Sequence, residues 1–260
     1  MPYTNAETEQ MNDALAGWFD RETRLTRDLF RIDLRTVEAR EMMEHGVGRR
    51  LAGLKHAIER VFEVIPPREE TPSQATIRDA SAFLQSFVIN IFGAMDNLAW
   101  LWRLQADIRG RNGQPLHRSR IGLTPGHVDL RRSLSERSQA YLRGTDDWFG
   151  YLEEYRHALA HRIPLYIPPK TLSEEDAVEF RRLGDQVGAD GWDWGRWGDV
   201  LTAQRALGVF EPVMMHSFGE GTRPVRFHGQ MICDFATVIE VAEHIVHDLL
   251  QTAQPNEPAV

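Results

Sequence analysis

The segment YRHALAHRIP, Tyr155 to Pro164, holds side chains whose types and spacing could carry chemistry. An imidazole such as that of His157 or His161 can accept and donate protons near neutral pH. A guanidinium such as that of Arg156 binds phosphate oxygens through a planar fork of N–H donors. The two histidines also occupy one face of a helix, where they could bind a metal ion. The segment therefore indicates proton transfer at a phosphate, a metal site or a solvated helix end.

A helical wheel with about 100° per residue divides the segment from Asp147 to His161 into two faces. The face expected to be buried holds Trp148, Leu152, Tyr155 and Leu159. The polar arc of Arg156, His157 and His161 points away from this stripe, so it needs solvent, a ligand or a second chain opposite it. A two-fold partner would bring two copies of the arc together, which predicts a site at a dimer interface.

The order Arg156, His157, three residues, His161 resembles the R-(N/D/H)-x-x-x-H motif of HEPN-domain proteins. The resemblance covers about residues 73–164, where a long apolar helix precedes the motif and Pro164 follows it. It implies that Arg156 and His161 are the two catalytic residues and that His157 fills the polar second position. The polar interruption in FGAMDNLAW implies supporting roles for Asp96 and Asn97.

The resemblance also implies an activity and a set of partners. Catalytic HEPN members are metal-independent endoribonucleases, so no cofactor or metal ion is expected. The RNA 2′-hydroxyl would attack the adjacent phosphate, leaving a 2′,3′-cyclic phosphate end and a 5′-hydroxyl end. The expected partners are RNA, a second copy of the chain, and an antitoxin or a nucleotidyltransferase, as in toxin–antitoxin pairs.

Two other functions stay open at this point. Many HEPN relatives do no chemistry, so the chain could be a noncatalytic HEPN-like interaction and dimerisation module. Alternatively, the pair formed by His157 and His161 could make a metal-binding helical bundle, with His244 and His247 as a second close pair. The first pair lacks the glutamate of H-E-x-x-H, which disfavours a metalloprotease-like site. A change at Arg156 would separate these functions, because a site made of histidines alone does not need it.

The elements that must position these residues are mainly helices. Periodicity and capping signals predict a mainly α fold, a helical bundle of the HEPN type with a small β-hairpin insertion before the C-terminal helix. Long helices are expected in residues 18–41 and, after a break at Gly46 to Gly48, in residues 49–65. The apolar helix at residues 73–108 should be the central one, and residues 191–199 should form a Trp-rich loop. We expect one domain over residues 1–252 and a disordered tail at 253–260.

Composition limits the classes of function. A net charge of −8 argues against nonspecific coating of nucleic acid, although nine arginines against three acidic residues between Arg103 and Arg143 make that segment locally basic. The one cysteine, Cys233, excludes a Cys-rich zinc site. The apolar run at residues 83–102 is interrupted by polar residues, which disfavours a membrane span. The N-terminus lacks the pattern of an export signal, so we expect a cytoplasmic protein.

Overall fold

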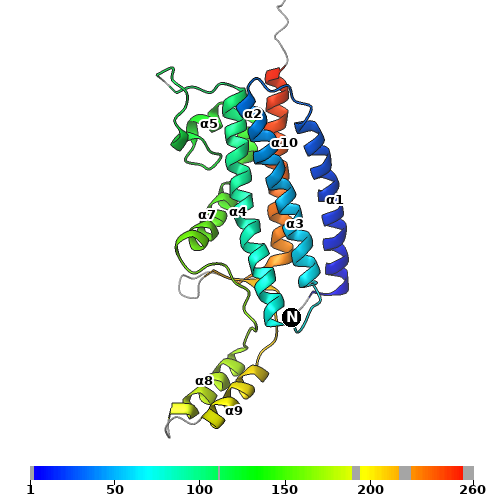
Figure 1. Ribbon diagram of the computed structural model, residues 1–260, viewed down its shortest axis with the longest axis vertical. Coiled ribbons are helices and arrows are strands. Elements are labelled where there is room, and N and C mark those ends of the chain that lie inside the picture. The colour runs from blue at the N-terminus through cyan, green and yellow to red at the C-terminus, as the bar shows by residue number, and fades with distance from the viewer. Residues whose placement is uncertain (1–2, 111, 189–193, 217–223, 254–260) are drawn as a thin grey trace, which may run out of the picture.

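The fold is a mainly helical bundle, as predicted. A computed structural model describes residues 3–110, 112–188, 194–216 and 224–253. Four long helices lie side by side (Figure 1). They are α1 (Asn5–Leu29), α3 (Arg49–Val64), α4 (Gln74–Gln105) and α10 (Phe227–Ala253). Their buried faces enclose a continuous apolar core, and α4 contributes to it along its whole length.

Shorter helices connect and flank these four. They are α2 (Val37–Glu41), the π-helix η1 (Met42–Gly48), the 3₁₀ helix η2 (Arg118–Arg120), α5 (Val128–Arg132), α6 (Glu136–Gly144), α7 (Asp146–His161), α8 (Glu174–Gly188) and α9 (Trp194–Ala206). Helices α5 and α7 lie beside α4, on the side opposite α1 (Figure 1). Helices α8 and α9 pack on each other beyond one end of the long helices (Figure 1).

Helix α4 is the central helix that the sequence predicts, with slightly narrower bounds. The hydroxyl of Ser73 accepts a hydrogen bond from the backbone N–H of Thr76 at 3.1 Å, so Ser73 acts as the N-cap. After this cap, the buried face of the helix carries no charged residue. At its other end the buried amide of Gln105 bonds the backbone at Asp33 and Arg35, which ties the α1–α2 connection to α4.

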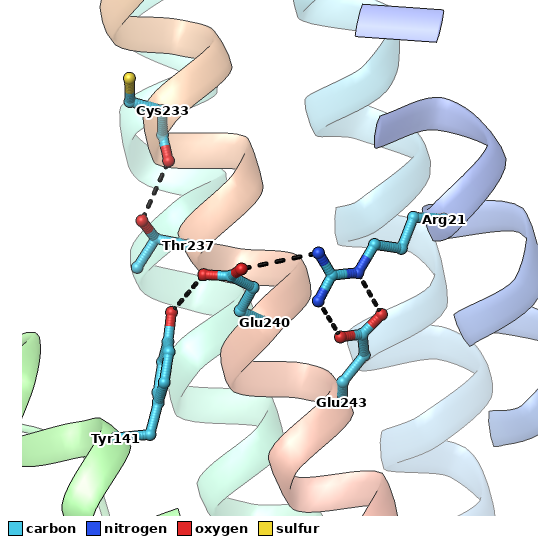
Figure 2. Close-up of polar contacts among 6 residues, drawn as sticks. All are labelled: Arg21, Tyr141, Cys233, Thr237, Glu240 and Glu243. Atoms are coloured by element: carbon cyan, nitrogen blue, oxygen red, sulfur yellow. Dashed lines mark hydrogen bonds and ion pairs between the residues drawn. The ribbon is translucent and has the colours of Figure 1, made fainter. Parts of the chain in front are cut away.

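Helix α10 docks through an apolar stripe with a helical period. The fully buried positions of this stripe are Phe235, Ile239, Ala242, Ile245 and Leu249. On a neighbouring face α10 carries carboxylates that hold α1 (Figure 2). The guanidinium of Arg21 donates from Nε and Nη2 to the carboxylate of Glu243 at 2.7 and 2.5 Å, and it lies 3.5 Å from Glu240. Tyr141 of α6 donates its hydroxyl to Glu240 at 2.6 Å, so three helices meet at this network.

A small antiparallel hairpin precedes α10, as predicted. Strand β1 (Val213–Met214) pairs with β2 (Val225–Arg226), with Val213 opposite Arg226. Residues 217–223, between the two strands, lie outside the described residues. Near the hairpin, the backbone of Tyr166 pairs with that of Met215, which ties the segment after α7 to β1.

Three sequence predictions about the helices are wrong. Residues 18–41 are not one helix, because α1 ends at Leu29 and Thr36 caps the new helix α2. No break occurs at Gly46 to Gly48, where a π-helix continues into α3. The predicted Trp-rich loop is wrong for residues 194–199, because α9 begins at Trp194 and its packing against α8 overrides the glycine content. Residues 191–193 of that prediction lie outside the described residues.

Helix α10 extends to Ala253, one residue beyond the predicted limit, and residues 254–260 of the predicted tail lie outside the described residues. The single domain itself stays a prediction. Within the described ranges, no helix has the length and apolar content needed to cross a membrane.

Candidate functional site

The end of α7 carries the predicted catalytic residues. The helix ends at His161, shortly before Pro164. The residue before a proline is disfavoured in helical geometry, so Ile163 cannot easily continue the helix. Its buried face is rotated slightly from the prediction. Leu152 and Tyr155 are buried as expected, but the other buried positions are Phe149 and Ala158, whereas Trp148 and Leu159 are only partly covered. Phe149 is thus buried where the helical wheel had predicted burial of its neighbour Trp148.

The polar arc of α7 is exposed, as predicted. Arg156, His157 and His161 all have exposed side chains. The guanidinium carbon of Arg156 lies 5.2 Å from the ring centroid of Phe92 on α4, a cation–π distance. The rings of His157 and His161 are 6.2 Å apart, and His157 Nε2 lies 4.0 Å from a Glu153 oxygen. The arc therefore offers an arginine held against α4 and two imidazoles open to solvent.

Asp96 lies beside Arg156, which brings two of the predicted residues together. It follows Phe92 by one helical turn, so it is on the strip of α4 that Arg156 covers. The protein atoms crowded around its carboxyl group raise the pKa of Asp96, while the charges of Arg156, His127 and Arg50 act to lower it. The side chain is still accessible to solvent. Asp96 is therefore a reachable carboxylate surrounded by positive groups.

Asn97 has a different neighbour, the guanidinium of Arg50 on α3. Arg50 donates from Nε to the side-chain oxygen of Asn97 at 2.9 Å and from Nη1 to that of Asn90 at 3.1 Å. Asn97 also donates from Nδ2 toward the sulfur of Met42 in η1, at 3.0 Å. The predicted supporting role of Asn97 thus takes the form of an anchor for an arginine that the sequence did not single out.

Two glycines allow these close approaches. A Cβ at Gly93 would collide with the guanidinium group of Arg50, so the arginine occupies the space left by the missing side chain. On the π-helix, a Cβ at Gly46 would lie 2.9 Å from Cγ of Asn97. Because a π-helical turn is often associated with function, its position against Asn97 marks this face of α4 as specialised.

His127 is the second residue that the sequence analysis missed. Its Nδ1 lies 2.8 Å from the hydroxyl of Thr124, and its ring fills the space beside Gly122 that a Cβ would take. The half-buried imidazole is thereby oriented at the start of α5, and its charge acts on Asp96. Asp96 therefore has positive groups from α3, α7 and the loop before α5 around it.

A signal for Arg50 is present in the sequence. Asn90, Gly93 and Asn97 follow one another at intervals of three and four residues, so they form a polar stripe on an otherwise apolar helix. An isolated glycine in a helix usually has a packing or functional reason. Together these three residues indicate that a hydrogen-bond donor from another element binds the two amide oxygens and occupies the space beside the glycine. The pattern does not identify that donor as Arg50.

His161 is not brought to Asp96 in the way that Arg156 is. It follows Arg156 by five residues, about 140° around the helix. The two predicted catalytic side chains therefore leave α7 in different directions, and a single phosphate can meet both only with a second copy of the motif or with the end of α7 bent inward.

The histidine pairs considered for metal binding have separate surroundings. Across the described residues, no group of three or more His, Cys, Asp or Glu side chains is placed to hold a metal ion. The ring of His244 stacks on Tyr141 with centroids 4.5 Å apart. His247 contacts the side chain of Gln251 at 2.9 Å.

The arginine-rich segment is partly neutralised by its neighbours. Arg109 pairs with Asp107 at 2.8 Å, Arg120 pairs with Asp129, and Arg131 pairs with Asp146 at 2.7 Å. Arg131 is buried and fastens the loop before α5 to the start of α7. These arginines serve the fold, so the segment offers less free positive charge than its composition indicates.

A separate groove of about 450 Å³ lies between η1 and α4. Its lining includes Glu38, Glu41, His45, Asn97 and Trp100. The two carboxylates disfavour phosphate there by charge repulsion. The positive groups around Asp96 are the better candidate for binding an anion.

Comparisons with protein-family models, with curated protein sequences and with solved structures found no match for this chain.

Proposed function

We propose that this protein is a metal-independent endoribonuclease of the HEPN type that acts as a homodimer, with Arg156 and His161 as its catalytic residues. The observation that carries the proposal is the setting of Arg156. Its exposed guanidinium rests on Phe92 and is close enough to affect the pKa of Asp96, so a helix-end arginine has a defined position beside a polar site.

The reaction follows from the properties of the two side chains. A His161 imidazole removes the proton of the RNA 2′-hydroxyl, and this oxygen attacks the adjacent phosphorus. The bond from phosphorus to the 5′-oxygen breaks, and the leaving oxygen takes a proton from His161 of the partner subunit. Arg156 stabilises the charge that develops on the phosphate oxygens. The products are a 2′,3′-cyclic phosphate end and a 5′-hydroxyl end.

Dimerisation is part of the proposal because Arg156 and His161 leave α7 in different directions. Arg156 and His161 lie about 140° apart on the helix, and both are exposed. A two-fold arrangement that stacks the ends of two α7 helices would bring His161 of the partner subunit toward Arg156. The exposed Ile163 next to the motif is an apolar contact for such a pairing.

Cleavage of a mixed RNA pool in EDTA tests the proposal. We expect the purified protein to produce cyclic-phosphate ends, and we expect Arg156→Ala and His161→Ala to lower the rate by a factor on the order of 10²–10⁴. Arg132→Ala, at an exposed arginine of α5, is the matched control and should cleave normally. If the protein is a folded dimer but leaves RNA intact, the noncatalytic interaction module is favoured instead. RNA cleavage that needs an added divalent metal would contradict the mechanism.

A further inference from the structure

We propose that Arg50 and Arg156, which contact neighbouring residues of α4 near Asp96, form a binding site for a phosphate group, with the imidazole of His127 close by. Assigning that phosphate to an RNA strand rests on the proposed function. The site itself rests on the contacts that the two arginines make with α4 between Asn90 and Asn97. Arg50 and His127 have no part in the sequence motif.

Arg50 is held in place without being neutralised. Two of its N–H groups go to the amide oxygens of Asn90 and Asn97, which are neutral acceptors. The guanidinium fits against the bare backbone at Gly93, so its position is defined by shape as well as by hydrogen bonds. Among the ion pairs of the described residues, none involves Arg50, in contrast with Arg131 and its partner Asp146. A fixed guanidinium whose hydrogen-bond partners are neutral amides is suited to an anion.

Arg156 has the same property by a different contact. Its partner on α4 is the face of Phe92, which attracts the guanidinium and leaves the charge in place. In the part of the chain that the structure describes, no ion pair of Arg156 with a carboxylate is found either. Its N–H groups at the edge away from the ring are therefore available to phosphate oxygens.

The charges of both arginines act on the carboxyl group of Asp96, so Asp96 lies near both of them. One carboxylate near two guanidiniums leaves an excess of positive charge. Because the Asp96 side chain is accessible to solvent, a phosphate can approach from the same side. His127, oriented by Thr124, adds a donor on the flank toward α5.

The test measures binding apart from cleavage. A fluorescein-labelled DNA 12-mer, which lacks the 2′-hydroxyl and resists the proposed reaction, is titrated at ~0.1 M salt, where distant surface charges are largely screened. Inorganic phosphate forms a second arm, followed by the shift in melting temperature. Arg50→Gln and Arg156→Gln should weaken binding about tenfold, and Arg49→Gln, next to Arg50 in sequence and exposed, is the matched control.

Gly93→Ala keeps every charge and so guards against loss of folding in Arg50→Gln. The added methyl group pushes the guanidinium of Arg50 away from α4, while alanine favours the helix over glycine. We expect normal stability with binding weakened about as much as in Arg50→Gln. A loss in the DNA arm identifies a polynucleotide phosphate, and a loss in the inorganic arm alone identifies free phosphate.

Unchanged binding in Gly93→Ala and Arg50→Gln in both arms, or no binding by the wild-type protein in either arm, would overturn the site. The outcome is independent of catalysis, because a protein that binds DNA through these residues but never cleaves RNA would keep the phosphate site and lose the proposed ribonuclease function.

Discussion

The guanidinium of Arg50 occupies the space that a β-carbon at Gly93 would need, so a residue of α3 is seated in the backbone surface of α4. The asparagines one turn away on either side, Asn90 and Asn97, bind it by their amide oxygens. This contact joins the π-helix, through Asn97 and Gly46, to the turn of α4 that carries Asp96. The positive charge near Asp96 therefore comes from α3 as well as from the motif on α7.

Asn97→Asp should weaken phosphate binding without unfolding the protein. The new carboxylate keeps the acceptor for Arg50 but neutralises the guanidinium, and the lost donor to the sulfur of Met42 is a weak one. We expect DNA affinity to fall about tenfold at constant salt. Circular dichroism and urea unfolding provide the control for structure, and an affinity equal to wild type would argue against a role for the Arg50 charge.

Asp96→Asn should have the opposite effect on binding. Asparagine removes the negative charge that competes with a phosphate for Arg50 and Arg156, while it keeps the size of the side chain. At pH 8, DNA affinity should rise about threefold to tenfold. Weaker binding in this variant would mean that Asp96 is needed to position Arg156, which would contradict its assignment as a competing charge.

The contact between α1 and α10 should show measurable coupling. Arg21 makes a two-point contact with Glu243, and both side chains are about one-third exposed, at 35% and 33% (Figure 2). A double-mutant cycle with Arg21→Met and Glu243→Gln, measured by urea unfolding, should give a coupling of about 1 kcal/mol. The cycle for the exposed pair Arg182 and Glu179 on α8 serves as the comparison and should give less. Equal couplings would mean that the contact between Arg21 and Glu243 is no stronger than an exposed pair within one helix.

The buried carboxyl group of Asp234 should give the protein a characteristic pH dependence. Burial raises the pKa of Asp234 to about 6, although Trp148 and Gln230 donate hydrogen bonds to the same oxygen at 2.9 and 2.8 Å. Since the unfolded pKa is about 3.9, the folded protein binds more protons between these values, and stability from this group is lost as pH rises from about 4 to about 6.

His228 acts in the other direction over the same range. Burial lowers its pKa to about 4, so its contribution to stability is lost as pH falls from about 6.5 toward 4. The Asp234→Asn variant keeps the acceptor oxygen and the His228 effect but lacks the Asp234 effect, so the His228 effect cancels when the two proteins are compared and only the Asp234 effect remains in the difference. The unfolding free energy of the variant minus that of wild type should therefore increase by on the order of 2–3 kcal/mol between pH 4 and pH 7. Urea unfolding at several pH values measures it, and a constant difference would contradict the buried, ionisable state of Asp234.

Local patterns made much of the fold predictable, but not the surroundings of the site. The buried stripe of α10, the Ser73 cap of α4 and the end of α7 before Pro164 each depend on neighbours in sequence, so they could be foreseen. The role of Arg50 depends on the packing of α3 against α4, across 47 residues of chain. The π-helix likewise forms where Gly46 meets Asn97, which no local period encodes.

The most direct test of the central claim uses a DNA oligonucleotide that contains one ribonucleotide. In EDTA, the wild-type protein should cut only at the 3′ side of that ribonucleotide and leave a 2′,3′-cyclic phosphate, and the His161→Ala variant should not cut. Cutting of an all-DNA oligonucleotide, or equal cutting by His161→Ala, would contradict 2′-hydroxyl attack assisted by the histidine at the end of α7.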